Sequence, residues 1–356
     1  MSGYKGNRKI GRGLQVIGFR KGEWMLSYIG GKNRIAPVLI HPNIHPHLDG
    51  IDTFVEPFSG AMWCYIQSDE IYKKVDKVIY NDFSPYMTNL FRCASDPKTF
   101  SKFIDKKNPP LQTKGKPELS QSCKDFFYEC KETLFYTDYA IKKIRNVLED
   151  KSITGKHRKA LNEALTFARA NRQCNNNNLR DAFGEKIKAG KKDQAAAMKY
   201  AYILTTAFSG IDPVDSEFQD YKGKYGSKFK AFYNRLTSDK FIPKLKKIES
   251  CENLSFEEVI KTYDSPTNYF YCDPPYWSTE LYYSLHRFGK EQHDELKECL
   301  HNIEGKFSLS YYDFSELSDM YPKSDFTWEM KEFVKPAGAK EGMEQSTGEE
   351  VLIMNH

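Results

Sequence analysis

The sequence predicts an α/β protein whose sheet is built from both ends of the chain. Strand-like runs bounded by turn residues form two groups that flank a long central segment, and they cover residues 53–58, 77–82, 268–276, 306–313, 325–334 and 349–356. Helical patterns alternate with these runs, as in residues 290–303, where Leu296, Leu300 and Ile303 recur at helical spacing. Strands that alternate with helices indicate an α/β sheet.

The central segment differs from both ends because it carries no strand pattern. Most of it shows helical patterns joined by polar loops such as residues 174–181, and residues 209–235 are rich in Gly, Tyr and Lys and read as irregular. We therefore expect one discontinuous domain formed by residues 1–107 and 236–356. A mostly helical domain is expected to be inserted at residues 108–235.

Length and composition describe an ordinary globular chain. Its 356 residues leave room for about two domains. Apolar residues make up 40%, charged residues 28% and aromatic residues 14%, which excludes disorder, collagen and coiled coil. No apolar run is long enough for a membrane span, the start lacks the apolar core of a signal peptide, and the eight cysteines form no C-x-x-C pattern. We expect a protein of a reducing cytoplasm.

The first two strand runs end in polar residues of a kind that bind nucleotides. Phe54 to Gly60 gives a strand, an acidic residue and a glycine turn that opens toward a helix, and the next strand ends in Asn81 and Asp82. An acidic residue at the end of a second strand is placed to accept hydrogen bonds from ribose hydroxyls. The alternative is that Asp82 caps the helix that follows Ser84.

Positive charge gathers in the central segment. The formal net charge of the chain is only +5, yet residues 141–200 hold 15 Lys and Arg against 6 Asp and Glu. Clustered positive charge attracts a phosphate backbone by counterion release, so we expect a nucleic acid partner. The alternative is a solvated face of a helix.

The strongest chemical signal is the run Asp273-Pro274-Pro275-Tyr276, which follows an apolar and aromatic strand. Two prolines fix the backbone, so that the carbonyl of Pro274 and the carboxylate of Asp273 can each accept one N–H from a planar amine, while Tyr276 stacks on its ring. Adenine carries such an exocyclic amine. The alternative is a proline turn that ends a strand.

These blocks, with Tyr28 to Lys32 (YIGGK) before them, resemble the Dam-type, alpha-class DNA adenine N6-methyltransferases, which carry the same motifs in the same order. The resemblance covers residues 28–92 and 240–356, including the closing run GEEVLIMNH. It implies a Rossmann-like S-adenosylmethionine-dependent methyltransferase sheet with an inserted, mostly helical target-recognition domain. It also implies S-adenosylmethionine as cofactor and duplex DNA as partner, for an enzyme that serves as a restriction companion, is phage-borne or stands alone.

Carried over position by position, the resemblance implies residues for the cofactor and for the base. The residues implied to touch the cofactor are Tyr28, Lys32, Glu56, Phe58, Gly60, Asp82 and Asp273. The residues implied to hold the target base are Asp273, Pro274, Pro275 and Tyr276. One departure is Met62, which stands where the family usually has a second glycine. Either the loop shifts and the thioether packs, or cofactor affinity suffers.

An adenine inside a duplex is out of reach, so it must be rotated into the pocket. Basic side chains of the insert are expected to hold the opened duplex, and the candidates are Lys142, Lys143, Arg145, Lys156, Arg158, Arg172 and Arg180. The mechanism needs no metal, and we interpret the histidines of residues 41–47 as part of a solvated loop. Alternatives are methylation of cytosine N4 or of RNA adenine, and a DNA-binding protein that has lost catalysis.

Overall fold

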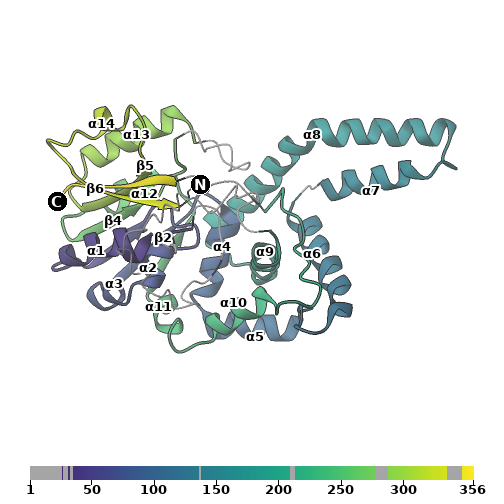
Figure 1. Cartoon of the computed structure of the whole chain (residues 1–356), viewed down its shortest axis with the longest axis horizontal. Helices are drawn as coiled ribbons and strands as arrows, with labels where there is room; N and C mark the ends of the chain where they lie inside the picture. The colour runs from purple at the N-terminus through teal and green to yellow at the C-terminus, as the bar shows by residue number, and fades with distance from the viewer. Residues whose placement is uncertain are drawn as a thin grey trace, which may run out of the picture.

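The computed structural model describes residues 26, 31–32, 35–135, 138–208, 213–277, 288–334 and 347–356. These residues form a sheet with helices on both faces and a second group of helices beside it, from which a pair of helices projects (Figure 1). Of the residues predicted for the site, Tyr28 lies outside the described residues.

The sheet has seven strands in the order β3-β2-β1-β4-β5-β7-β6. The strands are β1 (Thr53–Glu56), β2 (Lys77–Asn81), β3 (Ile248–Glu252), β4 (Asn268–Cys272), β5 (Lys306–Tyr312), β6 (Thr327–Val334) and β7 (Thr347–Met354). The first five are parallel to one another, whereas β7 is antiparallel to β5 and β6. This arrangement confirms the predicted α/β class and a Rossmann-like sheet built from both ends of the chain.

Each predicted strand run contains a strand, but the sequence analysis missed β3. This strand has one neighbour, β2, and so lies at the edge of the sheet. Only Ile248 and Cys251 of its five residues are buried. A short edge strand with few apolar residues has too weak a pattern to stand out from the polar chain around it.

Side chains of the strands alternate between two apolar cores, one on each face of the sheet. Phe54 and Tyr80 belong to one core, and Val55 and Ile79 belong to the other. The helices that line the first core near the sheet are η1 (Ala36–Ile40), α1 (His41–Ile44), α2 (Trp63–Gln67), α3 (Asp69–Lys74) and α11 (Ile242–Lys246), with η2 (His45–His47) following α1. The second core is covered by α12 (Phe256–Tyr263), α13 (Lys290–His301) and α14 (Leu317–Met320) (Figure 1).

The histidine-rich run at residues 41–47 is helical, so its interpretation as a solvated loop is wrong. His41 is buried, and its Nε2 lies 2.8 Å from the carbonyl oxygen of Cys64. Pro42 and Pro46 stand in the first turn of their short helices. Proline is tolerated there because the first turn has no partner for an amide hydrogen.

The second group of helices is arranged around α9 (Gln194–Thr206), which is buried over most of its length. The other members are α4 (Pro85–Ala94), α5 (Pro97–Lys107), η3 (Pro117–Leu119), α6 (Ser120–Leu134), α7 (Asp138–Glu149), α8 (Gly155–Lys188) and α10 (Lys228–Leu236). Phe127 and Tyr202 of this group belong to the same apolar core as Phe54 of the sheet. One continuous core therefore joins the helices to the sheet.

Two expectations for the central segment are wrong. The polar run at residues 174–181 lies inside α8, and α10 occupies part of the segment that reads as irregular. Asparagine is a poor helix former, but Asn176 is buried and α8 packs against α4, so tertiary contacts override the local preference. None of the helices in the described part of the chain is long and apolar enough to cross a membrane.

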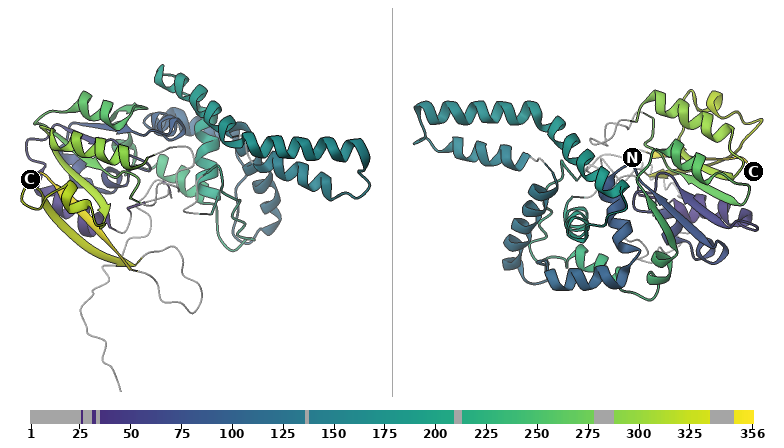
Figure 2. Two further views of the ribbon diagram at one scale, coloured as in Figure 1. Left: turned by 90° about the horizontal axis from the view of Figure 1, so that it is seen from above. Right: turned by 180° about the vertical axis from the view of Figure 1, so that it is seen from behind.

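The α7–α8 arm, residues 138–188, projects from the rest of the molecule (Figure 2). Its two helices pack on each other through Ile141, Leu165 and Ala168, which form a small core of their own. The later part of α8 returns to the body of the molecule and packs against α4.

A turn with two left-handed residues joins β1 to α2. Gly60 has φ 48° and Met62 has φ 55°. Glycine adopts this conformation freely, whereas a residue with a Cβ pays about 1–2 kcal/mol for it. The Met62 side chain is fully buried in the first apolar core, which offsets that strain. Met62 therefore departs from glycine by packing its thioether into the core.

We expect Met62→Ala to lose about 2–5 kcal/mol of unfolding free energy, because it leaves a cavity and keeps the left-handed Cβ. Met62→Gly leaves a similar cavity but removes the backbone strain, so it should be more stable than Met62→Ala by about 1 kcal/mol. Denaturant unfolding of the two variants measures this difference. Equal stability, or an alanine variant that is the more stable of the two, would contradict the assignment of strain to this position.

Candidate active site

The carboxyl ends of β1, β2 and β4 meet at one edge of the sheet, because β1 lies between two parallel neighbours. Open α/β sheets bind ligands at this edge. The loops that carry the predicted chemistry begin there, directly after Glu56, Asn81 and Cys272. The fold thus brings together three motifs that are far apart in the sequence.

Hydrogen bonds hold these strand ends in a fixed frame. The backbone N–H of Ser59 donates to the carbonyl of Asn81 at 2.8 Å. The side-chain amide of Asn81 donates to the carbonyl of Pro57 at 2.8 Å and accepts from the N–H of Leu254 at 3.0 Å. Asn81 therefore links the loops that follow β1 and β3 to the end of β2.

Asp82 follows β2 and faces the turn after β1. Its carboxylate accepts hydrogen bonds from the backbone N–H groups of Gly60 at 2.9 Å and Ser84 at 2.7 Å. Burial raises the pKa of Asp82 to about 6, although the two amide hydrogen bonds act in the opposite direction. A carboxylate has about four acceptor positions, so Asp82 can support the turn and still accept hydrogen bonds from a ligand.

Glu56 lies at the end of β1 and is buried. Burial raises its pKa to about 8; the hydrogen bond from the backbone N–H of Tyr65, at 2.9 Å, lowers it, and the nearby charge of Asp273 raises it further. Burial thus favours the protonated form of Glu56, and its bond from Tyr65 ties β1 to the first turn of α2. Phe58, two residues further on, packs against Phe256 with ring centroids 5.3 Å apart.

The run from Asp273 to Tyr276 follows β4, and Lys32 lies against it. The ammonium of Lys32 is 3.0 Å from Oδ1 of Asp273 and 4.3 Å from the centroid of the Tyr276 ring. Burial raises the pKa of Asp273, while the charge of Lys32 opposes this. Pro274 is buried, and the Asp273 side chain keeps 21% of its surface exposed.

Glu350 on β7 is a further acidic residue of this cluster, and the sequence analysis did not single it out. Its Oε1 lies 3.4 Å from the ammonium of Lys32 and accepts a hydrogen bond from the hydroxyl of Tyr276. Burial alone would lower the pKa of Lys32, but Asp273 and Glu350 together raise it above its usual value. The run GEEVLIMNH holds two adjacent acids, and only the structure shows that Glu350 is buried while Glu349 is exposed.

Aromatic rings surround the cluster. Trp277 stacks on Phe314 with centroids 5.0 Å apart and an interplanar angle of 6°, and its ring centroid lies 5.0 Å from that of His293. The ring of Tyr276 meets Tyr312 edge to face at 4.4 Å. The edge of the sheet therefore combines hydrogen-bond acceptors with flat apolar surfaces, as a pocket for a planar base requires.

Next to Asp82, an aromatic side chain is open to solvent. Phe83 is 56% exposed, and it follows Asp82 directly in the chain. The sequence analysis missed it because an aromatic residue after a strand reads as part of the core.

Among the described residues, no group of three or more His, Cys, Asp and Glu side chains could hold a metal ion.

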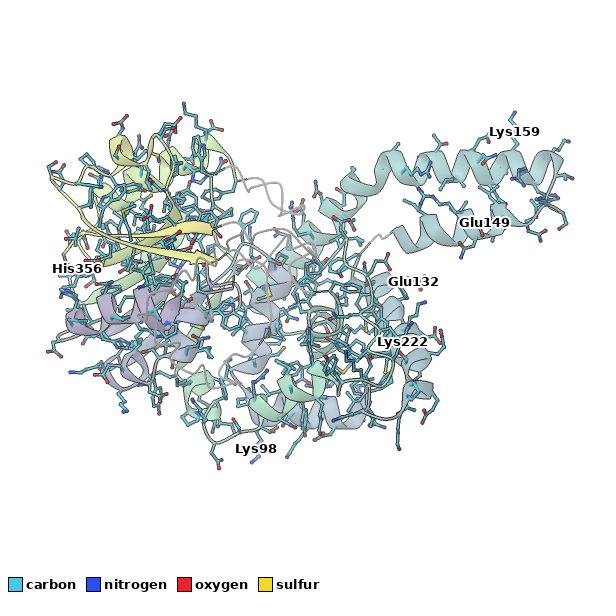
Figure 3. All side chains as sticks on the ribbon, viewed as in Figure 1. Lys98, Glu132, Glu149, Lys159, Lys222 and His356 are labelled. Atoms are coloured by element: carbon cyan, nitrogen blue, oxygen red, sulfur yellow. The ribbon has the colours of Figure 1, made fainter. Side chains whose placement is uncertain are left out.

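Among the predicted DNA contacts whose side chains the structure describes, Arg180 lies far along α8 from the others. Arg145 and Lys156 are exposed on the α7–α8 arm, where Figure 3 also shows Glu149 and Lys159. Arg180 lies 22 residues beyond Arg158 on α8, roughly 33 Å of straight helix, and its Nη2 pairs with Asp181 at 2.6 Å. The side chains of Lys142, Lys143 and Arg172 lie outside the described residues.

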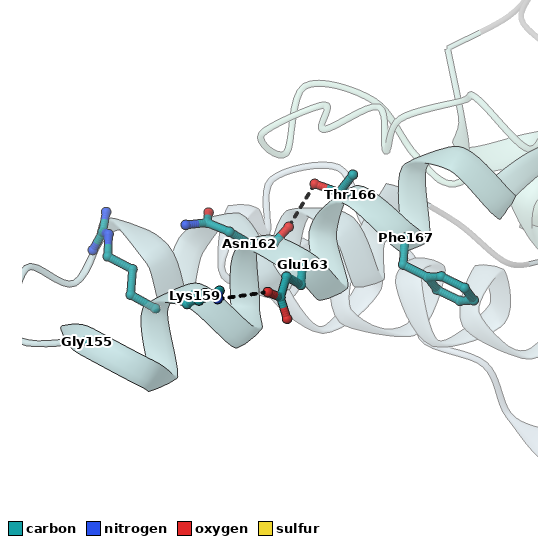
Figure 4. Close-up of a pocket in the computed structure, with 7 residues that line it drawn as sticks. Gly155, Lys159, Asn162, Glu163, Thr166 and Phe167 are labelled. Atoms are coloured by element: carbon teal, nitrogen blue, oxygen red, sulfur yellow. Dashed lines mark hydrogen bonds and ion pairs between the residues drawn. The ribbon is translucent and has the colours of Figure 1, made fainter.

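One side of α8 near the end of the arm forms a shallow hollow (Figure 4). The ammonium of Lys159 lies 3.9 Å from Oε1 of Glu163 there, and the hydroxyl of Thr166 donates to the carbonyl of Asn162 at 2.9 Å. Phe167 at its rim is 66% exposed. This surface is too open to enclose a small ligand.

Comparison with known proteins agrees with the geometry of the strand ends. No curated protein matches the chain in sequence. The model of one family, described as D12 class N6 adenine-specific DNA methyltransferase, matches residues 28–335, which is most of the chain and includes the motifs after β1, β2 and β4. The chain therefore belongs to the D12 class N6 adenine-specific DNA methyltransferases.

Proposed function

We propose that this enzyme uses S-adenosylmethionine as its methyl donor and methylates an adenine that has left the stack of duplex DNA. The observation that carries the proposal is the meeting of Asp82 and Asp273 at one edge of the sheet, each after its own parallel strand. The first is suited to a ribose and the second to an exocyclic amine.

The residues at the β1 and β2 ends fit S-adenosylmethionine. Asp82 has acceptor positions left for the two ribose hydroxyls, and the exposed ring of Phe83 offers a flat surface next to it. When both are ionised, the carboxylates of Asp273 and Glu350 outnumber the single ammonium of Lys32, so the cluster favours a further positive charge such as a sulfonium. Glu56, Phe58 and Gly60 complete the proposed cofactor side, together with Tyr28.

The proposed base site uses Asp273 and the carbonyl of Pro274 as acceptors for the two N–H bonds of the adenine amine. Bound S-adenosylmethionine supplies an electrophilic methyl group. Holding the amine by two acceptors would orient its nitrogen toward the cofactor side, which is a gain from orientation. The methyl group would pass from sulfur to nitrogen, and Asp273, which is partly exposed to water, would accept the proton that the nitrogen loses. Tyr276 and Trp277 provide the aromatic surfaces beside the base.

The helical segment at residues 108–235 is proposed to bind DNA. The α7–α8 arm reaches away from the sheet and carries Arg145, Lys156 and Arg158, which suits contacts to phosphates outside the target base pair. Enzymes of this family serve in restriction and modification, where such contacts position the target. We also infer a reducing cytoplasm, because all eight cysteines are free thiols.

Asp273→Ala should lower the rate of methyl transfer by about 10²- to 10³-fold, because one of two acceptors for the reacting amine is lost. The measurement is transfer of labelled methyl from S-adenosylmethionine to unmethylated duplex DNA, followed by digestion to nucleosides. Asp319→Ala, which removes an exposed carboxylate on α14, is the matched control and should keep the parent rate.

Three outcomes of this assay would contradict the proposal. Label on cytosine would support cytosine N4 as the target, and transfer to RNA in preference to DNA would support an RNA enzyme. DNA binding without any transfer by the parent would support a protein that has lost catalysis.

Affinity for S-adenosylmethionine should fall as the pH drops through about 6, because Asp82 takes up a proton there and loses acceptor strength. Asp82→Asn should weaken binding by about tenfold or more at pH 7.5 and should flatten this pH dependence. Calorimetric titrations of both proteins between pH 5 and pH 8, in steps of about one pH unit, measure the effect. A variant that keeps the parent pH profile would exclude Asp82 as its source.

Arg145→Ala/Lys156→Ala should weaken binding to duplex DNA and should lower the slope of log K against log salt by about 2, one for each lost phosphate contact. Lys98→Ala/Lys102→Ala removes the same charge from exposed positions on α5 and serves as the control. Fluorescence anisotropy at several salt concentrations gives both slopes. Equal slopes for the two double variants would mean that the arm does not bind phosphates.

A further inference from the structure

Lys32 occupies one of the two acceptors that the proposed mechanism gives to the target amine, and it also lies over the aromatic ring proposed to stand beside the base. Its ammonium hydrogen-bonds to Oδ1 of Asp273 at 3.0 Å and lies 4.3 Å from the centroid of the Tyr276 ring. An ammonium and an exocyclic amine are both N–H donors. A carboxylate has further acceptor positions, but the ammonium over the Tyr276 ring stands where the base would stack, so the two groups compete for this ring face and for the Asp273 oxygen beside it.

Lys32 cannot give up Asp273 without another partner. Its side chain is only 7% exposed, and a buried ammonium without a carboxylate is strongly destabilised. Glu350 is the second carboxylate within reach, 3.4 Å from the ammonium and 3% exposed. The hydroxyl of Tyr276 donates to Oε1 of Glu350 and thereby holds this carboxylate in place.

We propose that Glu350 is a positioning residue that takes over the ammonium of Lys32 when the target amine binds Asp273. The proposal rests on the proposed function, because it takes Asp273 as the acceptor of that amine. In this exchange the ammonium of Lys32, which both Asp273 and Glu350 contact, keeps only its contact with Glu350. The neutral amine then binds the oxygen of Asp273 that Lys32 has left. Neither carboxylate is left without a hydrogen-bond donor.

The first test is Glu350→Gln, which keeps the shape of the side chain and an acceptor for Tyr276 but removes the charge. Lys32 then has a single carboxylate, Asp273, and the base must displace it at greater cost. We expect kcat for methyl transfer at saturating S-adenosylmethionine to fall by about tenfold or more, while Kd for DNA changes by less than about twofold. Loss of a purely structural contact would not separate kcat from Kd for DNA in this way.

Glu349→Gln is the matched control. It makes the same chemical change one residue earlier on β7, where the side chain is exposed. Because successive residues of a strand point to opposite faces, this variant leaves the Lys32 cluster intact. Its kcat should equal that of the parent.

The decisive variant is Lys32→Met/Glu350→Gln, which removes the competitor together with the residue that receives it. With both carboxylates of the parent ionised, this double variant has the same net charge in the cluster as the parent. Its kcat should recover by about fivefold or more relative to Glu350→Gln, because no ammonium then blocks Asp273. A double variant no faster than Glu350→Gln, or a Glu350→Gln enzyme as fast as the parent, would overturn the proposal.

Two further results separate the possible failures. A parent enzyme that transfers no methyl group to adenine contradicts the proposed function itself, whereas an active parent with the wrong pattern among the variants contradicts only the role of Glu350. If thermal unfolding shows that Glu350→Gln does not fold, the double variant decides alone. Methyl transfer by a folded double variant then supports the exchange, and its inactivity overturns it.

Discussion

A buried ammonium between two carboxylates is the interaction on which the site depends. Lys32, Asp273 and Glu350 come from the start of the chain, the end of β4 and the last strand, and they meet with little contact with water. Two buried carboxylates without a cation would repel each other and take up a proton. The ammonium opposes this protonation of Asp273 and Glu350. In the proposed function, the negative charge that remains when both carboxylates are ionised favours a positively charged donor of the methyl group.

The parallel sheet supplies the frame in which this cluster works. Asn81 fixes the loops after β1 and β3 to the end of β2, so Asp82 and the turn at Gly60 hold a defined position. Helix α4 begins shortly after Asp82 and packs against both α8 and α9. The part of α8 that packs on α4 therefore connects the α7–α8 arm to the strand ends. In the proposed function, this connection relates phosphate contacts on the arm to the base site.

Local sequence patterns predicted the structure correctly where the interactions that produce it are local. The strand runs and the motifs after β1, β2 and β4 were recognisable because buried strands and strand-end loops have characteristic residues. Predictions from local patterns were wrong where a long-range contact overrides a local preference. The asparagine run belongs to a helix because α8 packs on α4, and the prolines near His41 stand in first turns that their helices tolerate. The edge strand β3 carried too little apolar character to be seen.

The sequence by itself determined the class of fold and the family. Both follow from short motifs that stand in a fixed order along the chain, each at the end of its own strand. It also named Asp82 and Asp273, since a strand-end acid is recognisable from its neighbours. Tertiary structure alone decided that Glu350 joins Lys32 and that Met62 packs its side chain into the core. Such contacts join residues that are distant in the chain, and sheet geometry, which no local pattern encodes, sets which of them meet.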